Sequence, residues 1–289
     1  MGNERRRKKK KRLNWPAVLA LMILLGGGGL AAVWQLKPEL LEVFSAVGQS
    51  DAQGPGSADE NPAPEEGSDA APQNQCPVIT LGADTVWVQA GSDFDPTANL
   101  TVTDPEDGEL SYMQDSITPV PGTYTIISTV DLTTPGAYVV TVSAKDLSGA
   151  MSETGYSVRV LAEGEQPGSA DATYIDGILL VSRDYPLPRN QGGSNAEANA
   201  ALQRLQAAAA GEGHDLPLLS GDRSFDEQVV LFNRYVRKDG LELAIRYSAP
   251  PGQSEHQTGL CFDVASLYRT FATTEAGIWL NEHCAEYGF

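Results

Sequence analysis

Apolar residues follow three different patterns along this chain of 289 residues. Residues 15–36 form an uncharged apolar run that is long enough to cross a bilayer as one helix. Residues 76–161 carry short β-branched runs between turn residues, whereas residues 173–289 mix helical and strand-like periods. Residues 37–75, after a few helix-forming positions, and residues 162–172 are rich in Gly, Pro, Ser and acids, so we predict linkers there. The pattern therefore predicts a multidomain chain.

Eight consecutive basic residues, Arg5–Arg12, come just before the apolar run. Basic clusters of this kind stay on the cytoplasmic side of a membrane span. We therefore predict a cytoplasmic segment at residues 1–14 and a single-pass anchor in the cell membrane, with the C-terminal domains extracytoplasmic. Trp34 at the far edge is typical of such an anchor. A cleaved secretory signal is the alternative, because Gly26–Gly29 offers small residues near a cleavage point.

Residues 76–161 are predicted to form an all-β sandwich. Tyr138, Val140, Val142 and Ala144 alternate with their neighbours, as expected for a strand with one buried face. Turn residues separate six predicted strands, and about 85 residues with six or seven strands are typical of a sandwich. The predicted strands cover residues 77–81, 85–88, 100–102, 124–129, 137–144 and 156–160.

The segment Val140–Gly149 resembles the strand and turn of bacterial Ig-like surface modules. This resemblance implies a spacer or an adhesion module. Several acids in its loops suggest a Ca²⁺ site, and a solvated loop edge is the alternative. These acids are Asp93, Asp95, Asp104, Glu106 and Asp107.

Residues 173–289 are predicted to form an α+β domain, because their helices and strands do not alternate in βαβ order. We predict helices over residues 195–210, 225–238 and 275–287, with strands at 178–181 and 259–264. Asn195 is a suitable cap for the first helix, and glycines follow the first two helices.

The acidic balance of the chain excludes one class of partner. Residues 38–289 carry 37 acidic and 11 basic residues, a net charge of −26. A domain of this charge is repelled by the phosphates that a nucleic-acid-binding protein must neutralise. We therefore expect no nucleic-acid partner.

The stretch from Ser248 to Val264 holds the candidate chemistry. His256 precedes Asp263 by seven residues, and imidazole and carboxylate are both ligands that zinc prefers. A fully extended segment of this length would hold them roughly 23 Å apart, so a shared ion requires the chain to turn back. Gly259 lies between them and is the residue best suited to such a turn.

The residues around this pair resemble those of a known family. Ser254–Leu260 followed by Phe262 and Asp263 is similar to the S-x-H-x-x-G-x-x-x-D signature of VanY-like D-alanyl-D-alanine carboxypeptidases, a group of zinc peptidases. Upstream, Ile178–Pro188 looks like the family's opening strand and Ser220–Ser224 looks like its S-G-Y-R-S element. The resemblance covers residues 176–289.

The resemblance implies roles for six residues. His256 and Asp263 would be ligands of a catalytic Zn²⁺, which activates water for attack on the scissile amide. The guanidinium of Arg223 would pair with the terminal carboxylate of a peptide. Gln228, Ser248 and Ser254 would contact the same substrate. The implied substrate is a peptidoglycan stem peptide that ends in D-Ala-D-Ala.

The remaining parts of the family's site are expected beyond Phe289. These are the glutamate that acts as general base and a further histidine ligand, and no E-x-x-H sequence occurs in the chain. His214 and His283 do not match the family's ligand positions. We therefore expect a truncated, impaired zinc metallocarboxypeptidase. The alternative is a non-catalytic cell-envelope binding module that retains a cleft for the carboxylate of a peptide.

The cysteines allow two further interpretations. On a strand, Cys261 and Asp263 would face the same side, which would place the thiol near the metal or simply in a small buried position. In an exported protein, Cys261 and Cys284 could instead form a disulfide, with Cys76 left unpaired.

Overall fold

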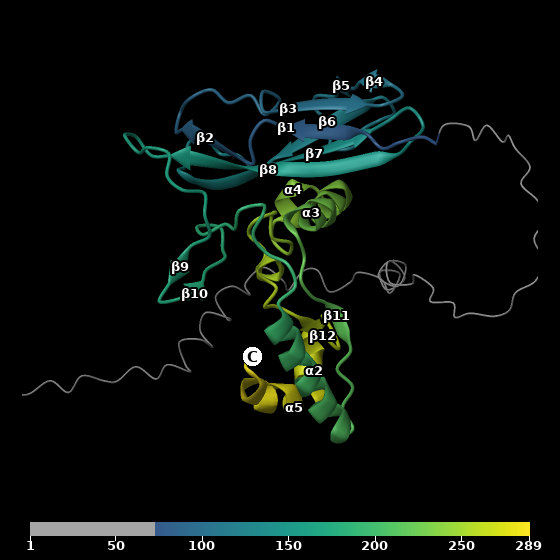
Figure 1. Cartoon of the computed structure of the whole chain (residues 1–289), viewed down its shortest axis with the longest axis vertical. Helices are drawn as coiled ribbons and strands as arrows, with labels where there is room; N and C mark the ends of the chain where they lie inside the picture. The colour runs from purple at the N-terminus through teal and green to yellow at the C-terminus, as the bar shows by residue number, and fades with distance from the viewer. Residues whose placement is uncertain (1–72) are drawn as a thin grey trace, which may run out of the picture. The chain divides into compact units, whose positions relative to one another are not determined.

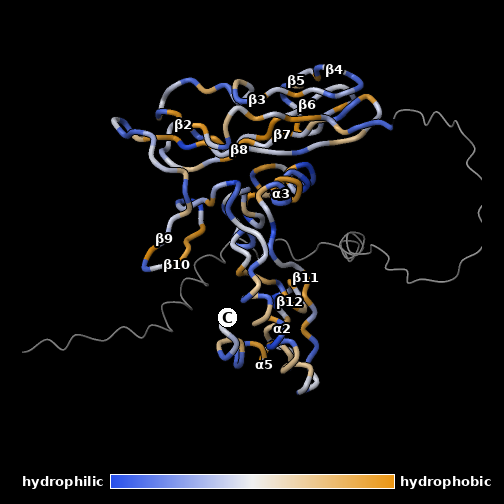
Figure 2. The backbone as a smooth tube through the Cα atoms, in the orientation of Figure 1, coloured by the Kyte–Doolittle hydropathy of each residue, from blue (hydrophilic) through white to orange (hydrophobic). Residues whose placement is uncertain are grey.

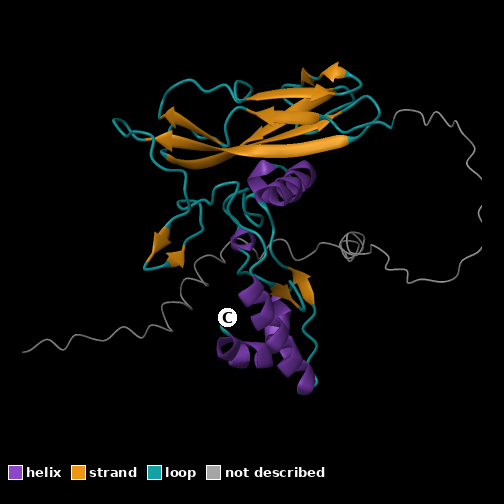
Figure 3. Ribbon diagram, in the orientation of Figure 1, coloured by secondary structure: helices purple, strands orange, loops and turns teal. Residues whose placement is uncertain are grey.

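The computed structural model describes residues 73–289 (Figure 1). The predicted cytoplasmic segment, the predicted anchor at residues 15–36 and almost all of the first linker lie outside the described residues. Within residues 73–289, no helix combines the length and the apolar character needed to cross a membrane. Most of the strands form one part of this region, and the helices follow it in the chain (Figure 3).

The first part consists of two packed β-sheets. The smaller sheet has the order β1 (Val78–Leu81), β3 (Leu100–Asp104) and β4 (Gly108–Glu109). The larger sheet has the order β2 (Thr85–Gln89), β8 (Met151–Leu161), β7 (Gly136–Lys145), β6 (Thr123–Ser128) and β5 (Ser111–Tyr112). All pairs are antiparallel except β2 with β8 and β5 with β6. The six predicted strands are therefore confirmed, and the short strands β4 and β5 were missed.

The inner faces of the two sheets share one apolar core. Val102 of β3 packs with Val142 and Ala144 of β7, and Ile79 of β1 joins the same cluster. Every second residue of β7 points into this core, as the alternation in the sequence predicts. The two-sheet arrangement agrees with the predicted sandwich, and the likeness to Ig-like modules stays a prediction.

One expectation about β7 was wrong. The sequence pattern predicted a strand with one buried face, yet Val139, Thr141 and Ser143 on its outer face are also buried. The reason is that helix α3 (Phe225–Asp239) covers this face of the larger sheet (Figure 1). The outer residues are small or β-branched, so they leave room for a helix to approach.

The second part of the described region has an α+β composition. It contains two short antiparallel strand pairs, β9 with β10 and β11 with β12, and four helices. The elements are β9 (Tyr174–Ile175), β10 (Ile178–Leu179), α2 (Ala196–Gly211), β11 (Leu218–Ser220), α3, α4 (Leu241–Ala244), β12 (Asp263–Val264) and α5 (Glu275–His283), with 3₁₀ turns η2 (Glu255–Thr258), η3 (Arg269–Thr273) and η4 (Cys284–Tyr287).

Three predicted elements are shorter than expected. The strand at residues 178–181 contributes only β10, whose hairpin with β9 carries exposed apolar residues (Figure 2). The strand at residues 259–264 is reduced to β12, because Gly259 has a left-handed backbone with φ 69°. The helix at residues 275–287 changes to the 3₁₀ turn η4 after His283.

The helices begin where their capping residues allow. The Asn195 side chain accepts a hydrogen bond from the amide of Ala198 at the start of α2, as predicted. Ser224 and Glu227 form a reciprocal capping box at the start of α3. Helices α2 and α5 then pack together around Leu202, Leu205 and Trp279.

Helix α3 is attached to the larger sheet by apolar and polar contacts. Phe225 and Val229 pack on Val139, and Phe232 and Val236 pack on Ile127. All five apolar residues on the helix and β7 sides of these contacts are almost completely buried.

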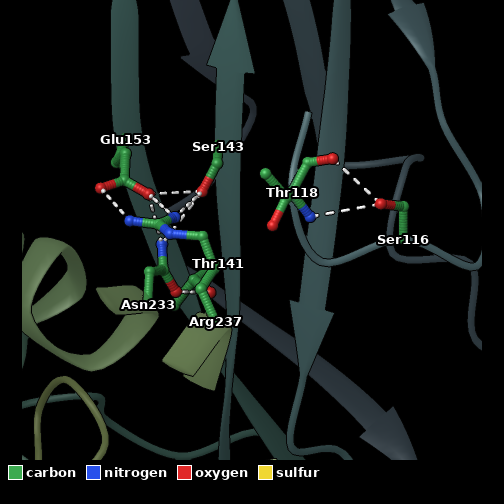
Figure 4. A network of polar contacts seen from close by, with 7 residues as sticks. All are labelled: Ser116, Thr118, Thr141, Ser143, Glu153, Asn233 and Arg237. Carbon is green, nitrogen blue, oxygen red and sulfur yellow. Dashed lines mark hydrogen bonds and ion pairs between the residues drawn. The ribbon is translucent and has the colours of Figure 1, made fainter. Parts of the chain in front are cut away.

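A buried polar cluster extends this attachment along the helix (Figure 4). Glu153 of β8 accepts hydrogen bonds from Arg237 Nη1 at 2.7 Å, from Asn233 Nδ2 at 3.1 Å and from the Ser143 hydroxyl. Asn233 Oδ1 in turn accepts from Thr141 Oγ1 at 2.6 Å. We call these five residues the outer clamp. They join positions of β7, β8 and α3 that are far apart in the sequence.

Candidate active site

The turn between His256 and Asp263 is built on Gly259. Residues Glu255–Thr258 form the 3₁₀ turn η2, and Gly259 ends it in the left-handed region. A Cβ atom at Gly259 would collide with the carbonyl oxygen of Gly193. Glycine is therefore required by both the backbone angle and the neighbouring chain.

This turn brings the two predicted metal ligands together. His256 Nε2 lies 3.2 Å from Asp263 Oδ2, and their side chains are 12% and 35% exposed. His256 Nδ1 lies 2.7 Å from the carbonyl oxygen of Gly221. Because a carbonyl oxygen only accepts, we assign the ring proton to Nδ1, which leaves Nε2 of the neutral ring able to bind a metal.

A second segment is joined to this turn by its backbone. The amide of Arg223 donates to the carbonyl oxygen of His256 at 3.1 Å. Strand β11 pairs with β12, and this pairing places Ser220 opposite Asp263. The S-G-Y-R-S-like element and the histidine turn thus form one continuous site.

The predicted substrate residues Arg223 and Gln228 are also in contact. Arg223 Nη1 donates to Gln228 Oε1 at 2.9 Å, and its Nη2 donates to Ser220 Oγ at 2.7 Å. Gln228 is 1% exposed, and its Nε2 donates to the carbonyl oxygen of Ala249 at 2.7 Å. The guanidinium is therefore held in a fixed position beside the His256 turn.

The two predicted serines, Ser248 and Ser254, are both buried. Ser248 precedes Ala249, and its hydroxyl oxygen has no hydrogen-bond partner within the described residues. Ser254 precedes η2 and is buried, and its carbonyl oxygen accepts from the amide of Gln257. The structure therefore places both serines next to site residues in the chain.

Residues 193–289 match the family model described as VanY: D-alanyl-D-alanine carboxypeptidase. This part of the chain is a VanY-like domain. A Bacillus subtilis (strain 168) protein named as a carboxypeptidase, YodJ, is 34% identical to this chain, with 39% of this chain and 50% of YodJ covered. A D-alanyl-D-alanine carboxypeptidase of Enterococcus faecium is 39% identical, with 24% of this chain and 20% of that protein covered.

The chain thus spans half of the length of the first curated relative and a fifth of the second. Among solved structures, an LD-carboxypeptidase named LdcB is 42% identical, with 39% of this chain and 63% of that chain covered and a TM-score of 0.35.

Sequence analysis missed three contributors to the VanY-like site. Ser220 positions Arg223, and the carbonyl oxygen of Gly221 orients His256. Gln257 is completely buried, and its Nε2 donates to the carbonyl oxygens of Pro188 and Gln191 at 2.9 and 3.0 Å. The available signal was their position inside the two quoted sequence elements, next to residues with assigned roles.

Cys261 lies near the site as a protonated thiol. Burial raises its pKa to about 12, and the nearby carboxylates of Glu255 and Asp263 act in the same direction. All three cysteines are free, so the suggested Cys261–Cys284 disulfide is not formed.

The other titratable candidates lie away from the VanY-like site. The ring of His214 lies beside that of Trp279 in a tilted arrangement, and His283 pairs with Glu286 at 3.0 Å. Asp95 and Asp104 accept hydrogen bonds from their own loops, and Asp95 is exposed whereas Asp104 is buried. Within residues 73–289, no group of three or more His, Cys, Asp or Glu residues is arranged to hold a metal ion.

Proposed function

We propose that this protein is a membrane-anchored, extracytoplasmic zinc carboxypeptidase that removes a terminal D-alanine from peptidoglycan stem peptides. The observation that carries the proposal is that His256 Nε2 lies 3.2 Å from Asp263 Oδ2 while His256 Nδ1 lies 2.7 Å from the carbonyl oxygen of Gly221. This is the arrangement in which histidine ligands of metal sites are usually held. The VanY match of residues 193–289 supports the same reaction class.

His256 and Asp263 fit zinc by donor type and by proximity. They are two of the three protein ligands that a catalytic zinc site usually has. When bound, zinc supplies a Lewis acid that polarises a carbonyl group and activates water. The chain's own contribution is to orient both donors through the Gly259 turn and the β11–β12 pair.

Arg223 and Gln228 are the proposed carboxylate-recognition pair. A guanidinium has five N–H donors, and the contacts to Gln228 and Ser220 use only two of them. The remaining donors are available for the terminal carboxylate of a peptide. A charged fork held by two neighbours loses little entropy on binding, which favours affinity.

The location of the protein is proposed from the sequence alone. The basic segment Arg5–Arg12 and the apolar residues 15–36 support a single-pass anchor with the VanY-like domain outside the cell membrane. A stem peptide of peptidoglycan is present in that compartment. Protease protection of the C-terminal domain in intact spheroplasts would contradict this location.

The proposed chemistry is tested by metal binding and by D-alanine release from the full chain. Zinc is added after removal of metal with a chelator, and free D-alanine is measured with two stem peptides, one ending in D-Ala-D-Ala and one with a single terminal D-alanine. We expect zinc-dependent release, and we expect His256→Ala and Asp263→Asn each to weaken zinc binding by at least about tenfold.

His283→Ala and Asp171→Asn are the matched controls, because they make the same substitutions outside the proposed ligand pair and its neighbouring segments. Equal zinc affinity in the wild type and in the His256→Ala and Asp263→Asn variants would contradict the proposed metal site. Peptide and zinc binding without release would favour the non-catalytic binding module. Preference for one of the two peptides would identify the stem peptide that is cleaved.

A further inference from the structure

The β-sandwich is in direct contact with the elements that carry the VanY-like site. The outer clamp and the apolar residues of α3 attach the body of this helix to the larger sheet. A separate set of contacts lies at the other end of α3, close to Arg223 and Gln228. Arg189, in the segment that leads from β10 to α2, is at its centre.

Arg189 connects the sandwich with the first turn of α3. Its Nη2 donates to Thr154 Oγ1 and to Asp226 Oδ2, both at 2.8 Å, and its Nη1 donates to the carbonyl oxygen of Gly155 at 3.2 Å. Thr154 Oγ1 also donates to Asp226 Oδ1 at 3.1 Å. The guanidinium lies over the ring of Phe225. One side chain thus bridges β8 and the residues that begin α3.

The same segment holds the histidine turn. The carbonyl oxygens of Pro188 and Gln191 flank Arg189 in sequence, and both accept from the buried amide of Gln257. The backbone of Gly192 is so close to Gln257 that a Cβ atom would collide with its carbonyl oxygen. These contacts join the segment that carries Arg189 to the residue that follows His256.

The two connections meet at the proposed substrate and metal residues. Asp226 lies two positions before Gln228 on α3, and Gln257 lies one position after His256. The amide of Arg223 and the carbonyl oxygen of His256 already join these two halves. Arg189 contacts Asp226 and belongs to the Pro188–Gln191 segment. Its side chain therefore helps to set the distance between the start of α3 and the His256 turn.

We propose that Arg189 is a positioning residue, through which β8 of the sandwich fixes the first turn of α3 and the segment that seats Gln257. The sandwich then belongs to the site's supporting structure and is more than a spacer. The effect of Arg189 on catalysis rests on the proposed carboxypeptidase function. Its effect on the conformation of the site does not.

Hydrogen exchange of the full chain, read by mass spectrometry, tests the conformational effect. We compare the wild type with Arg189→Ala, with Arg189→Lys and with Arg234→Ala, a control that removes the same charge from the exposed face of α3. In Arg189→Ala, amides of residues 223–228 and 254–260 should exchange about tenfold faster, because local opening becomes easier. Arg189→Lys should recover part of the protection, and Arg234→Ala should leave these segments unchanged.

Unchanged exchange in both segments of Arg189→Ala would overturn the proposal. If Arg189→Ala unfolds as a whole, the same exchange experiment is carried out on Thr154→Val. This substitution deletes one hydroxyl group and keeps the shape of the side chain. Faster exchange confined to the two segments in Thr154→Val supports the proposal, and wild-type exchange there overturns it.

Kinetics of D-alanine release separate this role from the proposed function. Arg189→Ala should raise KM and lower kcat together, because Gln228 and His256 both lose their fixed positions, and Arg189→Lys should restore part of each. Wild-type protein that releases no D-alanine would refute the proposed function, while the exchange pattern would still decide the role of Arg189.

Discussion

The ion pair of the outer clamp should contribute measurably to the free energy of unfolding, because it joins α3 to the larger sheet. The perturbation is Arg237→Met, which removes a charge and keeps an unbranched apolar stem. The side chains of Glu153 and Arg237 are 8% and 23% exposed, so the carboxylate would stay buried after its cation is lost. Breaking a fully buried pair costs about 3–5 kcal/mol.

Two features of the clamp reduce this cost. Asn233 and Ser143 continue to donate to Glu153 Oε1, and Arg237 is partly hydrated in the folded protein. We therefore expect Arg237→Met to lower the free energy of unfolding by about 2–3 kcal/mol. Glu153→Gln should cost about 1 kcal/mol, because the freed guanidinium can turn toward water.

The assay is urea unfolding of the full chain at neutral pH, followed by a double-mutant cycle. The variant with both Glu153→Gln and Arg237→Met should be more stable than the sum of the single losses predicts, by about 1–2 kcal/mol. This coupling should persist at high salt, because a buried pair is screened far less than a surface pair. Additive losses within about 0.5 kcal/mol would refute the buried ion pair, and Arg234→Met is the control on the exposed face.

Two further predictions concern the turn at Gly259 and the start of α3. Gly259→Ala should lower the free energy of unfolding by about 2–4 kcal/mol and disrupt the His256–Asp263 pair. Gly211→Ala is the control, because a Cβ atom there would contact no neighbouring atom, and it should be neutral or slightly stabilising. Thermal unfolding of both variants measures the difference. Ser224→Ala should cost about 1 kcal/mol through loss of the cap. Hydrogen bonds from Ser224 hold the pKa of Glu227 below its ordinary value, so the stability from the Glu227 charge is present above that ordinary value and is lost as the pH falls through the lowered one. Unfolding at several pH values should then show the difference between wild type and Glu227→Gln narrowing below about pH 4, and a constant difference would contradict the assignment.

Local patterns in the sequence were sufficient for most elements of the described region. The alternation in β7, the capping residues of α2 and α3 and the turn at Gly259 each follow from a few neighbouring residues. The proximity of His256 and Asp263 was expected from the resemblance to the VanY-like signature, and Gly259 ends the turn that brings them together.

The attachment of α3 to the sandwich could not be predicted in the same way. Thr141, Ser143, Glu153, Asn233 and Arg237 are polar residues that are typical of a hydrated surface when each is read alone. Their burial becomes favourable only when donors and acceptors 80 or more residues apart meet. Sequence periodicity contains no information about such pairings. Gln257 was missed for the same reason, because its partners Pro188 and Gln191 lie 69 and 66 residues away in the sequence.

The apolar residues along one side of α3 limit how this protein can be divided into fragments. Phe225, Val229, Phe232 and Val236 are covered by the larger sheet. A fragment that begins after Leu161 would present these four side chains to water, and each large apolar group costs about 1.5–3 kcal/mol when it is uncovered. The sandwich therefore cannot be removed without exposing α3. A fragment cut at the second linker would need polar substitutions on this face of α3, or another protein bound to it, to remain soluble.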